Sequence, residues 1–260
     1  MAPLEPGYVD LLSRVVDHLE GDPRVRAIWL SGSVGRGVAD AGSDLDLVVT
    51  VADASAFEDA SVWGFVDPVV TIPIAGLAGF VFTTRQGLRL DVVLETPADV
   101  ASSPYTHRVG VLDRDGLAPP VPTDEESPPD VGRMQGLVTE VLRQCAIFPA
   151  AVVAREDWLL GQVAVQNHQQ LLYLLLVESN QPLPVMGLKQ WSIRLTADQR
   201  DLLAGLPVPR AERASVVAAM TAVRAAIRTE GRAALESAGG TWPTEVDDAL
   251  AAYWERHGLA

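Results

Sequence analysis

One stretch, residues 27–50, constrains the fold of this chain more than any other. It begins with the apolar segment Ala27–Leu30, passes through a glycine-rich turn at Gly32–Gly37, and ends with a second apolar segment at Leu47–Val49. Short apolar segments bounded by turn signals are typical of buried strands. The stretch therefore predicts two strands of a sheet, joined by a turn of small residues.

Two aspartates stand where the second apolar segment begins. On a strand, Asp44 and Asp46 point to the same face, while Leu45 and Leu47 point to the opposite face and into a core. Two carboxylates side by side repel each other unless a cation lies between them. Carboxylates suit Mg²⁺, which completes its shell with water and substrate phosphates. This spacing predicts a magnesium site at the start of a strand.

The turn before the aspartates suits a phosphate group. Small residues let backbone N–H groups approach an anion, and the Ser33 hydroxyl can donate a hydrogen bond to a phosphate oxygen. Other phosphate motifs are excluded, because a P-loop needs a Gly-Lys pair and Lys189 is the sole lysine, while a dinucleotide fingerprint needs glycine at Asp40. The turn and the aspartates together describe a site for a metal-bound triphosphate. The alternative is a solvated turn with capping aspartates.

A third carboxylate lies on a later strand, predicted over residues 88–95. Leu88, Leu90 and Val92 share one face of that strand, which leaves Asp91 on the other. A lone carboxylate in an apolar strand is costly unless it is paired or bound to a metal. Asp91 is therefore the candidate for the third carboxylate of two-metal phosphoryl transfer.

The combined pattern resembles the nucleotidyltransferase superfamily that shares the polymerase-beta palm. The resemblance spans roughly residues 8–116 and is carried by Gly32-Ser33, by the segment Ser43–Asp46, and by Asp91. The most similar branch acts on small molecules and includes the aminoglycoside and lincosamide nucleotidyltransferases. Metal-dependent glycosyltransferases also use an Asp-x-Asp pattern, but they lack the Gly-Ser turn.

The resemblance implies a Mg²⁺-dependent enzyme with two metal ions and with ATP as its co-substrate. Its catalytic and metal-binding residues would be Asp44, Asp46 and Asp91. The residues that would bind the nucleotide are Gly32, Ser33, Arg36 and Ser43.

The general base and the acceptor pocket are less defined by the resemblance. Asp91 is the first candidate for the base, and the carboxylates Glu156 and Glu178 of the predicted helical region are alternatives. Four further side chains could line a pocket for the acceptor, although packing in a helical core is the expectation for each: Trp158, His168, Tyr173 and Trp191.

The chain predicts an α+β protein with a catalytic and a helical part. Residues 1–118 are expected to form a small mixed sheet with helices on one face, and residues 119–130, rich in proline and acid, to form a linker. Residues 131–260 predict an all-α bundle of four to six helices that binds the acceptor. The helices are expected at 131–148, 156–178, 196–206, 211–237 and 244–256.

The net charge of −14 is unevenly spread, because residues 1–130 hold 21 acidic and 8 basic side chains. An acidic catalytic half argues against binding nucleic acid and favours a small cationic acceptor. No apolar run approaches the length of a membrane span, and residues 1–6 lack the features of a signal peptide. Cys145 is the sole cysteine, so no internal disulfide forms. A cytoplasmic protein without membrane contact is expected.

The leading hypothesis is transfer of a nucleoside monophosphate, AMP from ATP, to a hydroxyl of a small molecule. An aminoglycoside- or lincosamide-like antibiotic is the expected acceptor, which would make the protein an antibiotic-resistance enzyme. One alternative is AMPylation of a protein partner, as in toxin–antitoxin systems. Another is a non-catalytic nucleotide-binding module of the same fold. Specificity depends on pocket shape, which a single sequence does not reveal.

Overall fold

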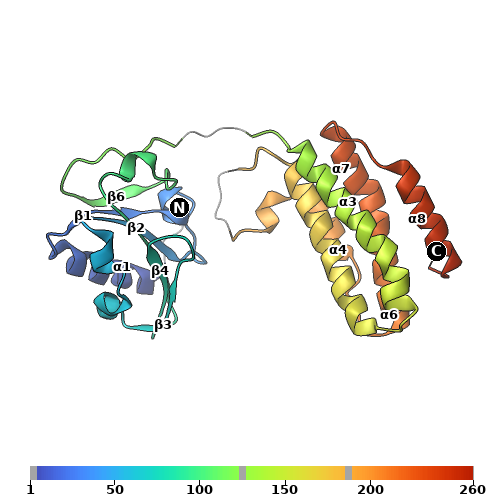
Figure 1. Ribbon diagram of the computed structural model, residues 1–260, viewed down its shortest axis with the longest axis horizontal. Coiled ribbons are helices and arrows are strands. Elements are labelled where there is room, and N and C mark those ends of the chain that lie inside the picture. The colour runs from blue at the N-terminus through green and yellow to red at the C-terminus, as the bar shows by residue number, and fades with distance from the viewer. Residues whose placement is uncertain (1–4, 123–126, 185–188, 260) are drawn as a thin grey trace. The chain divides into compact units, whose positions relative to one another are not determined.

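A computed structural model describes residues 5–122, 127–184 and 189–259 (Figure 1). These residues form two compact units, each with its own hydrophobic core. The first contains residues 5–122 together with Lys189 and Gln190, and the second contains residues 127–184 and 191–259. A mixed sheet in one unit and helices in the other confirm the predicted α+β class.

The predicted limits of the domains, 1–118 and 131–260, remain a prediction. The two units divide the residues of the predicted linker between them. They also differ from the prediction in that Lys189 and Gln190 contact the first unit, although the sequence places them in the helical region. Residues 123–126 of the predicted linker lie outside the described residues. Its described remainder, 119–122 and 127–130, contains no helix or strand.

The first unit is built on a six-stranded mixed sheet with the strand order β3-β4-β5-β2-β1-β6. At its centre, β2 (Leu45–Val51) and β5 (Arg89–Glu95) run parallel, and the other neighbouring pairs are antiparallel. The remaining strands are β1 (Val25–Leu30), β3 (Pro68–Pro73), β4 (Gly79–Thr84) and β6 (Val109–Asp113). The short segment α2 (Gly32–Gly35) follows β1.

One face of this sheet packs against helices. The helix α1 (Pro6–Glu20) and two 3₁₀ segments, Ala54–Phe57 and Ala60–Val66, cover it. Alternate residues of β2, β4 and β5 enter this core, as the period of two requires. The buried side chains include Leu45, Leu47 and Val49 of β2, Leu90 and Val92 of β5, and Leu11, Val15 and Leu19 of α1.

The opposite face of the sheet carries the polar side chains. Trp29 donates from its indole N–H to the Thr50 hydroxyl at 3.1 Å, and that hydroxyl donates to Glu95 at 3.0 Å. Arg108 forms a buried ion pair with Glu95 at 2.6 Å. Thr50 and Glu95 are register partners on β2 and β5, so this network fixes the register of the parallel pair. The same register determines which side chains meet at the other end of the two strands.

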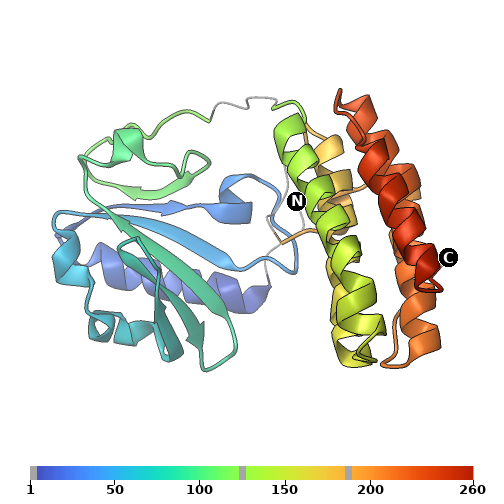
Figure 2. The same ribbon diagram turned by 45° about the vertical axis from the view of Figure 1, so that its right-hand side comes forward.

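The second unit is a helical bundle, and in Figure 2 its helices run alongside one another. The prediction of four to six helices is confirmed, and the 3.6-residue apolar pattern explains their shared core. A π-helical turn at Ile227–Gly231 joins two helices within the region predicted as one. The helices are α3 (Val131–Phe148), α4 (Trp158–Ser179), α5 (Ala197–Gly205), α6 (Arg213–Ala226), α7 (Arg232–Ser237) and α8 (Thr244–Arg256).

One helical segment, Val131–Val153, has the length and composition of a membrane span. The expectation that no apolar run reaches this length is therefore wrong by that measure. The segment nevertheless packs as a core helix, because Val138, Val141 and Cys145 are buried within the bundle. A single such helix in this setting is weak support for a membrane segment.

Candidate functional site

The parallel register of β2 and β5 places Asp46 directly opposite Asp91. Asp44 precedes β2 and lies two residues before Asp46, so its side chain can reach the same face. One carboxylate oxygen from each of these three residues lies within 4.8 Å of the others. Residues that are distant in the sequence are thus assembled into one cluster of negative charge.

The cluster perturbs the acid at its centre. Burial, together with the negative charges of Asp44 and Asp91, raises the pKa of Asp46 to about 6. The nearby cations Lys189 and Arg89 act in the opposite direction without cancelling this effect. Ionisation of Asp46 is therefore electrostatically unfavourable, and a divalent cation between the carboxylates would offset this cost.

Two cationic side chains that the site prediction omitted accompany the carboxylates. Arg89 binds Asp91 with two hydrogen bonds, of 2.9 and 2.8 Å, and lies 3.5 Å from Asp44. Lys189 forms an ion pair with Asp44. A signal for Arg89 was present, since residues 89 and 91 share one face of a strand. The sequence offered a weaker indication for Lys189, which is the sole lysine of an acidic chain.

The predicted glycine-rich turn includes a single helical turn, α2, which lies between β1 and the carboxylates. Gly32 has a φ of 57°, and a Cβ at this position would lie 1.8 Å from the Oδ2 atom of Asp46. Only glycine allows the backbone to approach the carboxylate this closely. The hydroxyl of Ser33 is buried and has no hydrogen-bond partner among the described residues. Such a group usually has a partner, so a ligand with a hydrogen-bond acceptor fits here.

These groups line one cavity of about 260 Å³ in the first unit. The predicted nucleotide-binding residues Arg36 and Ser43 belong to it, although the Ser43 hydroxyl is engaged with Asp40 at 3.1 Å. Gln190 also donates to Asp40, at 2.8 Å. The lining residues are Gly32, Ser33, Arg36, Asp40, Gly42, Ser43, Asp44, Asp46, Arg89, Asp91, Lys189 and Gln190.

The residues present fit magnesium and a triphosphate. Three convergent carboxylates supply the oxygen ligands that Mg²⁺ prefers. The same cavity offers phosphate partners in the unpaired Ser33 hydroxyl and in the side chains of Arg36 and Lys189. The arrangement can therefore hold a nucleotide by its phosphates and stabilise charge that develops on a phosphorus centre.

The alternative bases of the helical region lie in the second unit. Glu178 is buried, accepts a hydrogen bond from the backbone N–H of Asp130 at 3.0 Å and pairs with Arg133 at 3.2 Å. These contacts hold the start of α3, which gives Glu178 a structural role. Glu156 precedes α4 with a φ of 54°.

The aromatic and imidazole candidates separate into core and surface. His168 is fully buried, with its Nε2 atom 3.5 Å from the Cys145 sulfur, and Tyr173 is buried as well. Trp158 is half-buried and packs against the same core. Core packing was thus the correct expectation for these three, although Tyr173 also lines a pocket of the second unit. It was wrong for Trp191, which is 55% exposed and lines a pocket of the second unit.

Comparison with known proteins gives a match to a family model and low similarities to several solved structures. Residues 10–76 match the family model described as "Nucleotidyltransferase domain". The chain is similar to an aminoglycoside 6-adenyltransferase from Bacillus subtilis, at 13% identity and a TM-score of 0.44, over 97% of this chain and 98% of that one. The CCA-adding enzyme of Thermotoga maritima, complexed with tRNA, is similar at 18% identity and a TM-score of 0.26, over 35% and 21%. Curated protein sequences give no match.

Identities and TM-scores this low assign neither a substrate nor a partner to this chain. The family match is more specific, because it covers most of α1, all of β1, the glycine-rich turn, and the two aspartates at the start of β2. The third carboxylate, Asp91, lies beyond the matched residues, and the fold brings it to the other two. The first unit therefore contains a segment that matches a nucleotidyltransferase domain.

Proposed function

We propose that the protein transfers a nucleoside monophosphate, AMP from ATP, to a hydroxyl of a small molecule in a Mg²⁺-dependent reaction. The observation that carries this proposal is the register of β2 and β5, which brings Asp46 and Asp91 together beside Asp44. The unpaired Ser33 hydroxyl in the same cavity supports a phosphate-bearing ligand. Two magnesium ions, when bound to these carboxylates, would stabilise the attacking and the leaving oxygens.

The reaction forms one bond and breaks one bond at the α-phosphorus. The acceptor oxygen attacks this atom, the bond to the β-phosphate oxygen breaks, and pyrophosphate leaves. Asp91 is the group that we propose takes the hydroxyl proton, since it lines the cavity from the first half of β5. Ser33, Arg36 and Lys189 are proposed to hold the phosphates, so that the protein contributes mainly positioning and charge.

A small-molecule acceptor is favoured by the second unit, which carries a pocket of its own. We further propose that the enzyme acts in the cytoplasm, where ATP and Mg²⁺ are supplied, and that its acceptor is an antibiotic. A protein acceptor is the competing candidate, and the experiment below separates the two.

The test is pyrophosphate release from ATP and Mg²⁺ with a panel of aminoglycosides and lincosamides. Release that requires a panel member, and that disappears in Asp46→Asn, supports the proposal. Asp113→Asn is the matched control, because this exposed aspartate of β6 does not line the cavity. Absence of release across the panel, while ATP still binds by calorimetry, would refute the antibiotic acceptor and favour a protein substrate.

A further inference from the structure

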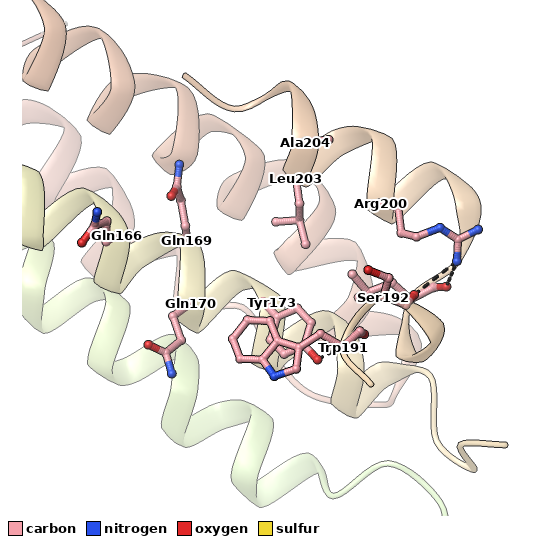
Figure 3. Close-up of a pocket in the computed structure, with 10 residues that line it drawn as sticks. Gln166, Gln169, Gln170, Tyr173, Trp191, Ser192, Arg200, Leu203 and Ala204 are labelled. Carbon is pink, nitrogen blue, oxygen red and sulfur yellow. Dashed lines mark hydrogen bonds between the residues drawn. The ribbon is translucent and has the colours of Figure 1, made fainter. Parts of the chain in front are cut away.

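A second cavity, of about 580 Å³, lies within the helical unit (Figure 3). Its size suits a drug-sized molecule. The walls come from α4, from α5, and from the segment that precedes α5. The residues that line it are Gln166, Gln169, Gln170, Tyr173, Trp191, Ser192, Leu195, Arg200, Leu203 and Ala204.

An aromatic surface forms one wall of this pocket. The rings of Trp191 and Tyr173 stack (Figure 3), and their centroids are 4.2 Å apart with planes inclined by 12°. Tyr173 is buried beneath, and its hydroxyl donates to the Trp191 carbonyl oxygen at 3.3 Å. The supported indole is nevertheless 55% exposed. A rigid indole that is open to solvent offers a flat apolar surface on which a ring of a ligand can stack.

The polar side chains of the pocket other than Arg200 are neutral donors and acceptors. Gln166 and Gln170 project from α4, and their side-chain amides have no hydrogen-bond partner among the described residues. Gln169 makes a single long contact, 3.5 Å, to the Pro207 carbonyl oxygen. Each amide can both donate and accept, which is the pattern that hydroxyl groups require.

The charge of the pocket is the decisive feature. Its described lining contains no carboxylate, and its one charged side chain is Arg200. The guanidinium of Arg200 is held by the carbonyl oxygens of Ser192, at 3.3 Å, and Leu195, at 2.7 Å, so it stays at the pocket wall. A polycation would meet a positive charge there and no negative partner, which disfavours its binding.

We infer that this pocket binds the acceptor, and that the part of the acceptor it binds is a neutral ring bearing hydroxyl groups, as in an uncharged glycoside. The inference rests on the proposed function only in treating the ligand as the acceptor, whereas the class of ligand follows from the pocket alone. A neutral ligand replaces the small cationic acceptor that was expected from the acidic composition of the chain. The excess of negative charge lies in residues 1–130, and the pocket is lined by residues 166–204.

The test measures binding to the full chain carrying Asp46→Asn, so that no turnover occurs. The neutral probes are chloramphenicol, 4-nitrophenyl β-glucoside, and lincomycin at a pH where its amine is uncharged, and the polycationic probe is kanamycin. Calorimetry is expected to give binding of a neutral probe and none of kanamycin. Trp191→Ala is expected to weaken the neutral probe about tenfold, since it removes the stacking surface, and Trp191→Phe to restore most of the affinity.

A charge variant provides an independent measurement. Gln170→Glu introduces a carboxylate at an exposed position of the lining, and it is expected to permit kanamycin binding. Asn167→Glu, at an exposed α4 position outside the lining, is the matched control. It adds the same charge to the same helix and is expected to leave kanamycin unbound.

Three results would overturn the inference: kanamycin binding more tightly than every neutral probe, no neutral probe binding at all, or binding that is unaffected by Trp191→Ala. Pyrophosphate release by the wild-type enzyme separates the two proposals. If release occurs with kanamycin alone, the transferase stands and the inference is wrong. If a neutral probe binds through Trp191 and no acceptor gives release, the ligand class is supported and the proposed function is wrong.

Discussion

Replacing Asp46 by asparagine is expected to stabilise the metal-free protein while it removes the activity. Asp46 is surrounded by the carboxylates of Asp44 and Asp91 and is largely removed from water. Arg89 and Lys189 compensate this negative charge in part. The neutral amide of asparagine keeps the shape of the side chain and removes the central charge of the cluster.

The size of the effect follows from the pKa of Asp46, which is raised from 3.8 to about 6. At about 1.4 kcal/mol per pKa unit, this shift corresponds to a destabilisation of the folded state by about 3 kcal/mol when Asp46 is ionised. Because the pKa is higher in the folded state, the ionised group destabilises the fold above about pH 6, and this destabilisation disappears as the pH falls towards 3.8. Asp46→Asn should therefore raise the free energy of unfolding by about 3 kcal/mol near pH 8 and by almost nothing near pH 4.

Hydrogen exchange in the presence of EDTA, which removes bound metal, measures this gain in unfolding free energy for the first unit. Backbone amides of β2 and β5 report the unfolding of the first unit, and wild type and variant are compared at each pH. Asp44→Asn is the matched control, since that carboxylate contacts Lys189 and Arg89 and its loss should bring no comparable gain. Equal protection of Asp46→Asn and wild type near pH 8, or a gain that is the same near pH 4, would refute the reasoning.

Three further outcomes are expected. Gly32→Ala should destabilise the first unit by more than about 1 kcal/mol and abolish pyrophosphate release, because its Cβ would lie 1.8 Å from Asp46 Oδ2 at a φ of 57°. Ser33→Ala should weaken ATP binding by calorimetry about tenfold or more, with a change in stability below about 0.5 kcal/mol, and a strongly destabilised variant would contradict this. Burial lowers the pKa of His168, so exchange protection of α3 and α4 should fall as the pH drops below 6.5, and a flat profile would contradict it.

Much of the first unit was predictable from local pattern. The two apolar segments around the glycine-rich turn form β1 and β2, and the alternation of residues 44–47 correctly separates the aspartates from Leu45 and Leu47. Period-two alternation determines faces because each strand residue reverses the side-chain direction. The same logic placed Asp91 on the polar face of β5.

The helical unit was predictable in outline and less so in its pocket. Apolar periodicity located its helices within a few residues, and Thr196, the first residue of the helix predicted at 196–206, caps α5. Periodicity does not tell which large side chain stays exposed, and Trp191 therefore was assigned to the core. Its exposure depends on Tyr173, 18 positions earlier, occupying the space beneath it.

The sequence by itself determined the chemistry available to this protein, namely three carboxylates, a glycine-serine turn and an α+β organisation. The tertiary structure alone decided that Asp46 faces Asp91, because the register of a parallel pair depends on contacts such as Thr50 with Glu95 at the far end of the strands. It also decided that Arg89 and Lys189 share the carboxylate cavity. Charge that is spread along a chain has a local effect only where folding concentrates it, because electrostatic interactions weaken with distance and with exposure to water.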